Sequence, residues 1–218
     1  MSDPHVGVPL AQNAFLRRLV AVYLAFWLWA ALFPVERSTW LLENLLVFGL
    51  LGLLAATHRR FVFSNLSYGL IFAFLALHTV GSHYTYSAVP AGFWVRDALG
   101  LERNHYDRLV HFAFGLLLAY PIREVFLRAV HVHRVWSWVV PVLVMLALSS
   151  AYEILEWWAA RLADSEVGMA FVGAQGDVWD GQKDMTLALV GAMLAMRAAA
   201  LLRRRRGHEP YLGLRRPA

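Results

Sequence analysis

Four short stretches of the 218-residue chain combine residue types that can bind a cation or transfer a proton. Each places carboxylates, imidazoles or basic side chains directly against an apolar run. Ionisable side chains within membrane helices are rare and costly, and they usually face the interior of a helix bundle, so they are the first candidates for a functional site. The four stretches are HTVGSHY at 78–84, RNHYDRLVH at 103–111, SSAYEILE at 149–156 and GDVWDGQKD at 176–184.

The spacing within two of these stretches places pairs of ionisable residues on one helix face. Asp107 and His111 are four positions apart, and Glu153 and Glu156 are three positions apart. Residues at these separations are neighbours on the surface of an α-helix. Because apolar residues flank His111 and both glutamates, we expect these three side chains to face the interior of the bundle.

Three aspartates precede the last apolar run of the chain. Asp177, Asp180 and Asp184 are separated by three and then four positions, so a helix through them would align all three. Gly181 argues against a continuous helix here. The alternative is that Asp180 caps the helix that follows.

Carboxylate oxygens and imidazole nitrogens together suit Mg, Mn, Zn or Fe ions, so a divalent metal ion is the candidate cofactor. The spacings are not specific, because such pairs also arise by chance. The candidate catalytic residues are Asp107, His111, Glu153, Glu156 and Asp184. The candidate metal ligands are His78, His83, His111, Glu153, Asp177 and Asp180.

Two other interpretations use the basic residues of the same stretches. In the first, Arg103, Arg108 and Lys183 bind a phosphate group while His111 and a carboxylate act as acid and base. In the second, the glutamates of the third stretch pair with these basic residues and only lock the helices together. The sequence leaves the choice open.

The composition indicates what kind of molecule positions these residues. The chain is 59% hydrophobic and 16% charged, whereas a soluble domain carries about 25% charged residues. It has no cysteine, which excludes disulfides, thiolate metal ligands and cysteine nucleophiles. The net charge of +5 does not predict nucleic-acid binding, because the basic residues flank apolar segments. The expected partner is the lipid bilayer.

A membrane-spanning helix needs about 20 mostly apolar residues, and six segments qualify. We therefore expect an all-α fold: one membrane domain over residues 1–218, with a basic cytoplasmic tail over 203–218. Arg17 and Arg18 precede an apolar run without a clear cleavage site, which is typical of a retained signal anchor. The expected helices are 16–33, 40–57, 61–80, 107–126, 135–158 and 185–202.

The basic residues also predict the orientation. Of the 20 Lys and Arg residues, 14 fall on the side of the N-terminus and six on the other. Because cytoplasmic loops are enriched in Lys and Arg, both termini are expected in the cytoplasm. Successive helices alternate in direction, so all four ionisable stretches are expected together at the outer face, where they would line a shared polar cavity. The inner halves of the helices are expected to be apolar.

The motifs YTYSAVP, RNHYDRLVHFAFG, SSAYEILEWW and GDVWDGQKDM together resemble the YjdF-type family of bacterial inner-membrane proteins. The resemblance runs from the second expected helix to the sixth. It implies a multi-pass protein of the bacterial inner membrane and implies no particular reaction.

A more distant likeness is to VanZ-like membrane proteins, and it suggests an envelope or glycopeptide-response setting. In that family an Asp-x-x-x-His-Phe element, a later Glu and an Asp before a small-residue final helix occur in this order. Lys183 and Trp179 depart from that pattern, so no function is carried over. The corresponding residues here are Asp107, His111, Phe112, Glu153 or Glu156, Asp180 or Asp184, and Gly191.

Three classes of function follow from the sequence. The leading hypothesis is a membrane enzyme, metal-assisted, that acts on a lipid headgroup or a lipid-linked envelope precursor at the outer face. The second is a small transporter or a proton or cation pathway through the same carboxylates. The third is a structural or accessory membrane protein with buried ion pairs. A pathway requires polar residues across the midplane, whereas the other two keep them at one end.

Overall fold

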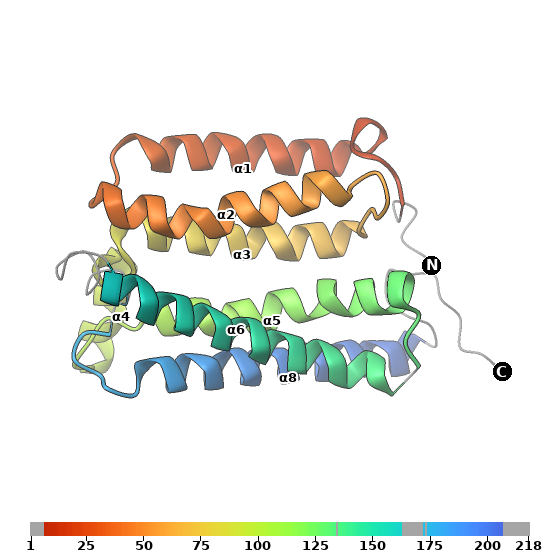
Figure 1. Ribbon diagram of the computed structural model, residues 1–218. Coiled ribbons are helices and arrows are strands. Elements are labelled where there is room, and N and C mark those ends of the chain that lie inside the picture. Colours follow the sequence, from red (N-terminus) through yellow and green to blue (C-terminus); the bar gives the residue numbers. More distant parts are fainter. Residues whose placement is uncertain (1–6, 134, 163–171, 173, 207–218) are drawn as a thin grey trace.

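The computed structural model describes residues 7–133, 135–162, 172 and 174–206, and its regular structure over these residues is helical (Figure 1). Six helices are long and apolar enough to cross a membrane, which confirms the all-α, six-span prediction. They are α1 (Ala14–Leu32), α2 (Arg37–Thr57), α3 (Asn65–Tyr84), α5 (Tyr106–Val125) with a π-helical turn (Phe126–Val130), α6 (Trp136–Leu162) and α8 (Asp180–Arg206).

All six spanning helices begin within five residues of the expected start, and the third and the last differ most from the prediction. The third was expected over 61–80 but begins at Asn65, because the side chain of Ser64 accepts a hydrogen bond from the Ser67 N–H and caps the helix. The last was expected from 185 but begins at Asp180 and continues through Gly181. Asp177 lies before this helix, so the three aspartates do not share one helix face. Of the expected basic tail, 203–206 continue α8 and the rest lies outside the described residues.

A short helix, α4 (Pro90–Leu99), was not predicted from the sequence, since its ten residues are too few to span a bilayer. Gly100 ends it in the left-handed conformation, with φ of 65°. Its Gly92 packs directly against Asn104, because an added Cβ would lie 1.8 Å from the Asn104 amide oxygen. Buried Asn104 also donates to the Val89 carbonyl at 2.9 Å and accepts from the Tyr106 N–H at 3.0 Å. This contact joins α4 to the first turn of α5.

The spanning helices form two groups that lie side by side in Figure 1. In one group α1 and α2 pack on α3, and in the other α5 packs on α8 and α6. The contact between α3 and α5 joins the two groups. Because successive spans alternate in direction, the C-terminal ends of α1, α3 and α6 and the N-terminal ends of α2, α5 and α8 share one end of the bundle (Figure 1). We refer to this end as the α5-start end.

Glycines allow α5 and α8 to approach until their backbones touch. A Cβ added to Gly115 would lie 1.9 Å from the Ala188 carbonyl oxygen, and one added to Gly191 would lie 2.2 Å from the Phe112 carbonyl oxygen. Small residues at helix crossings permit such close packing within membranes. This crossing fixes the position of α8 relative to α5. On both helices it lies at least one turn deeper in the bundle than the ionisable residues at the α5-start end.

The end of the bundle opposite the α5-start end is not apolar throughout, which corrects the sequence expectation. Glu124 is fully buried there and accepts hydrogen bonds from the N–H and the hydroxyl of Ser64, both at 2.8 Å, and from the Ser67 hydroxyl. It also pairs with Arg128. Arg123, also buried, lies 3.6 Å from the ring centroid of a tryptophan of α6. Between the two ends the described core is apolar.

Candidate functional site

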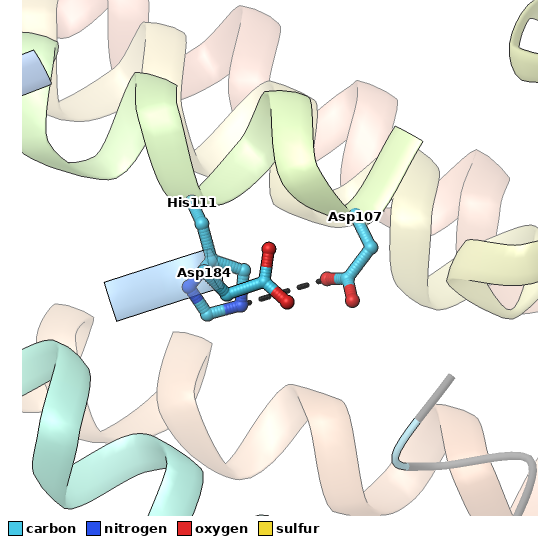
Figure 2. A group of neighbouring side chains, drawn as sticks. All are labelled: Asp107, His111 and Asp184. Atoms are coloured by element: carbon cyan, nitrogen blue, oxygen red, sulfur yellow. Dashed lines mark ion pairs between the residues drawn. The ribbon is translucent and has the colours of Figure 1, made fainter. Parts of the chain in front are cut away.

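Three ionisable side chains converge at the α5-start end. Asp107 and His111 lie one turn apart on α5, and Asp184 faces them from the second turn of α8. All three residues are buried, and one ligand atom from each lies within 4.8 Å of the others. Figure 2 shows the three side chains pointing toward one another. The sequence placed Asp107 and His111 on one helix face, and the α5–α8 crossing supplies Asp184.

Glu153 of α6 extends this group from a third helix. Its Oε1 lies 3.5 Å from His111 Nε2, and Asp107 Oδ1 lies 3.6 Å from the same nitrogen. These distances exceed a normal hydrogen bond. They match the separation of two ligands on one cation, which is roughly 3–4 Å for bonds of about 2.0–2.5 Å. Gly181 makes room for the glutamate, because an added Cβ would lie 2.7 Å from Glu153 Oε2.

Two carboxylate oxygens of this group make no hydrogen bond within the part of the chain that the structure describes. Asp184 Oδ1 and Glu153 Oε1 are buried and have no hydrogen-bond partner among the described residues. Glu156, also buried, adds a further carboxyl group one turn from Glu153. Buried carboxyl groups that face one another repel unless a cation or shared protons offset their charge. The set of Asp107, His111, Glu153 and Asp184, which we call the carboxylate–histidine cluster, therefore has the chemistry of a cation site.

The basic residues that the sequence suggested as phosphate ligands are paired with aspartates of the segment before α8 and of its first residue. Arg103 donates to Asp180 Oδ1 at 2.6 Å, and Arg108 is paired with Asp177. Lys183 donates to Asp177 Oδ2 at 2.5 Å. Asp177 and Asp180, which the sequence suggested as metal ligands, are thus engaged with cationic side chains. These ion pairs hold the segment before α8 against the start of α5.

Titration of the groups just outside the spans follows from these contacts. The hydrogen bond from Lys183, followed by that from the Trp179 N–H, lowers the pKa of Asp177 to about 2. Partial burial, followed by the charges of Arg108 and Arg103, lowers the pKa of His105. At neutral pH, Asp177 is therefore a fixed negative charge in an ion-pair network, and His105 is neutral.

A second polar group lies beside the cluster, on α2, α3 and α6. His78 Nε2 lies 3.0 Å from the Glu43 carbonyl oxygen, which can only accept, so Nε2 carries the proton and donates. His78 Nδ1 then accepts a hydrogen bond from the Tyr86 hydroxyl at 2.5 Å. Burial raises the pKa of Tyr86 well above its usual range, which keeps this donor protonated. The Tyr152 hydroxyl donates to Glu43 Oε2 at 2.9 Å. Both ring nitrogens of His78 are thus occupied.

His83 lies apart from both groups. Its Nδ1 donates to the Ala30 carbonyl at 2.8 Å, and its ring stacks on Trp29 with centroids 5.5 Å apart. The structure gives this histidine contacts that attach α3 to α1, and does not bring it to the other candidate metal ligands.

A cavity of about 410 Å³ opens from these polar groups toward the middle of the bundle. Its polar end is lined by His78, Tyr86, Asp107, His111 and Glu156. The remaining lining comes mostly from apolar residues of α2, α3, α5 and α6. The sequence predicted a polar cavity lined by carboxylates and histidines, but it did not predict the apolar extension of this cavity, because those apolar walls look like any other membrane-helix surface.

Fold and site together define a class: a multi-pass integral membrane protein with a cluster of buried carboxylates and histidine at one end of its helix bundle. Residues 15–205 match the model of a family described as predicted membrane protein (DUF2238). Inner membrane protein YjdF of Escherichia coli (strain K12) is 45% identical over 159 residues, which cover 72% of this chain and 76% of the relative. No solved structure matches the chain significantly.

The chain therefore belongs to the DUF2238 family of membrane proteins. The resemblance to the YjdF-type family is confirmed, and with it the placement among inner-membrane proteins. The comparisons give no support to the more distant likeness to VanZ-like proteins, which stays a prediction.

Proposed function

We propose that this protein is an inner-membrane enzyme that binds a divalent cation in the carboxylate–histidine cluster and acts on a lipid or lipid-linked envelope precursor. Both termini lie in the cytoplasm in this proposal, so that the cluster opens at the outer face. The excess of Lys and Arg at the opposite end of the bundle supports this orientation.

The observation that carries the proposal is the unpartnered Asp184 Oδ1. Asp184 is 2% exposed, and its free oxygen belongs to a group whose other members, Asp107 and His111, approach it from α5. A buried carboxylate without a partner is strongly destabilising in a bilayer unless something in the functional state binds it. A divalent cation satisfies this oxygen and offsets the repulsion within the cluster.

The surrounding residues suit chemistry on a headgroup. A bound cation would supply Lewis acidity toward a phosphoryl or carbonyl oxygen. Glu156 and Glu153 lie one turn apart beside it and are placed to accept or donate a proton. The cavity provides an approach from the apolar side, which suits an amphiphilic substrate.

The apolar core argues against a transmembrane proton or cation pathway. The polar side chain of Asn44 on α2 accepts a hydrogen bond from the Trp27 indole at 2.7 Å and donates one to the Trp40 carbonyl at 2.7 Å. Asn65 lies at the far end of α3 and accepts from Asn13 at 2.8 Å. The described residues between the two polar ends form apolar clusters, so they offer no continuous relay across the midplane.

Metal content tests the proposal. Detergent-purified protein is incubated with Mn²⁺, Zn²⁺ or Mg²⁺, desalted and measured by elemental mass spectrometry as wild type, Asp184→Asn and His111→Ala. We expect near-stoichiometric metal in the wild type and a loss of at least about tenfold in both variants. Asp97→Asn is the control, since Asp97 is an exposed carboxylate that pairs with its neighbour Arg96 at 2.7 Å. Its metal content should match the wild type.

Activity is tested on the same samples. Metal-loaded wild type and Asp184→Asn are reconstituted with a total polar lipid extract of bacterial membranes, and lipid products are followed by mass spectrometry. A headgroup change that requires Asp184 supports the enzyme. Two results together refute the cation site. The wild type contains no metal after incubation, and the thermal melts of the wild type and of Asp184→Asn are the same whether or not metal is added. An Asp184→Asn variant that fails to fold in every condition supports the structural interpretation instead.

A further inference from the structure

The cavity beneath the carboxylate–histidine cluster has the shape of a groove along α5. Its lining extends on α5 from Asp107 to Ile122, a distance of about 22 Å at the helical rise of 1.5 Å per residue. One leaflet contributes about 15 Å of hydrocarbon to a bilayer. The groove is therefore longer than one leaflet is deep, which leaves room for a headgroup at its polar end and for part of an acyl chain below it.

The groove opens sideways, toward the hydrocarbon of the bilayer. Leu53 of α2 and Leu155 of α6 line it and are each 60% exposed, and Leu148 of α6 lines it and is 47% exposed. Its inner wall is formed by α5, where Val110 is buried at the back. In a membrane, only hydrocarbon is available to fill an apolar groove that opens at this depth.

One serine in the groove lacks the partner that its neighbour has. Ser150 donates to the Leu146 carbonyl at 2.9 Å, which is the usual way a serine is satisfied within a helix. Ser149 is buried and lines the groove, yet its hydroxyl has no hydrogen-bond partner among the described residues. It lies seven residues deeper than Glu156, or about 10 Å along α6.

We propose that the groove binds one acyl chain of a glycerophospholipid, with the ester carbonyl at the Ser149 hydroxyl and the headgroup at the carboxylate–histidine cluster. The ester groups of such a lipid lie just below its headgroup, which is where Ser149 lies relative to the cluster. The phosphate needs a cation between it and the carboxylates, so this inference rests on the proposed function and names the substrate class for it.

A polyprenyl carrier lipid fits less well. It has no ester carbonyl for Ser149, and its chain is longer than a single leaflet. The two lipid classes are therefore distinct outcomes of the test.

Retained lipid provides the first test. The wild type, Leu50→Trp, Leu45→Trp and Ser149→Ala are purified with extensive detergent washing, and bound lipid is extracted and quantified by mass spectrometry. Leu50 lines the groove, whereas Leu45 lies on the same helix, is 64% exposed and is outside the lining. We expect stoichiometric glycerophospholipid in the wild type and Leu45→Trp, a loss of about tenfold in Leu50→Trp, and a smaller loss in Ser149→Ala.

Photochemical labelling of the unaltered wild type covers the case in which Leu50→Trp fails to fold. The protein is reconstituted with a phospholipid that carries a diazirine on its acyl chain, irradiated and digested, and the labelled residues are mapped. Label on Val110 or Phe114 requires a chain inside the groove, because Val110 is 4% exposed at its back. Label confined to outward residues such as Leu45 overturns the proposal.

The remaining outcomes separate this inference from the cation site. Glycerophospholipid retained by metal-free protein keeps the acyl-chain site in the groove, but it overturns the proposed cation and, with it, the placement of the headgroup phosphate at the cluster. Metal bound by protein that neither retains lipid nor is labelled inside the groove keeps the cation site and overturns the groove proposal. Retained polyprenyl phosphate, or equal lipid in Leu50→Trp and Leu45→Trp, overturns the assignment to an acyl chain.

Discussion

Replacing Gly115 with alanine tests whether the contact between α5 and α8 holds the candidate site together. The added methyl group would lie 1.9 Å from the Ala188 carbonyl oxygen and 2.8 Å from both the Ala188 carbonyl carbon and the Ala192 nitrogen. All three are backbone atoms, so no side chain can rotate to make room. The two helices themselves have to move apart.

The size of the movement follows from these distances. Ordinary contact begins at 3.4 Å, so α5 and α8 must separate by about 1.5 Å at this point. Overpacking of this kind costs about 1–3 kcal/mol, which lowers the midpoint of thermal unfolding by about 2–12 °C for a chain of this size. Asp184 moves with α8, away from Asp107 and His111. Metal ligands tolerate errors of only about 0.2 Å, so we expect cation binding to weaken by more than the stability loss suggests.

The assay compares Gly115→Ala with Gly52→Ala. Gly52 is also a glycine within a membrane helix, but an added Cβ there meets nothing within 4 Å. Its replacement should be neutral, or stabilising by up to about 1 kcal/mol through helix propensity. Thermal unfolding in detergent and metal content are measured for both variants. Equal melts and equal metal content in the two variants would show that the α5–α8 contact does not position the cluster.

Two further predictions concern the ends of the bundle. Glu124→Gln should destabilise the protein by about 3 kcal/mol in denaturant unfolding, because it leaves Arg128 without its buried partner, whereas the exposed Asp97→Asn should change stability by less than about 1 kcal/mol. The ion-pair network at Asp177 should be insensitive to pH from 7 down to about 4 and should weaken at lower pH. The pKa of Asp177 is about 2 in the folded protein, which is below its ordinary value. The stabilisation that Asp177 contributes is therefore complete above the ordinary pKa and is lost as the pH falls toward 2. Thermal melts between pH 3 and 7 should therefore fall at the acid end in the wild type and fall less in Asp177→Asn, and parallel curves would refute the assignment.

Sequence patterns were sufficient to predict the six spanning helices and to place the four ionisable stretches at one end of the bundle. Apolar length predicted six spans, and the alternation of their directions placed the stretches around His78, Asp107, Glu153 and Asp184 at one end. These predictions succeed because each depends on local composition and on the thickness of a bilayer.

Pairing of side chains could not be predicted in the same way. The sequence suggested the two arginines for phosphate binding and the two aspartates for metal binding. In the structure Arg103 pairs with Asp180, and Arg108 pairs with Asp177. Which carboxylate meets a guanidinium and which meets an imidazole depends on the rotation of α8 about its axis. Backbone contact at Gly191 fixes that rotation, and a single sequence does not reveal which glycines make contacts.

The order of the helices along the chain has a consequence for biogenesis. α5 carries Asp107 and His111, and its partner α8 is the last of the six spans, so α6 must enter the membrane before the two can meet. Until then, α5 exposes the surface around Gly115 and a charged first turn to lipid. A chain halted before α8 thus displays an intramembrane surface that the contact between α5 and α8 covers in the folded protein. Assembly of the cluster and completion of the fold are one event.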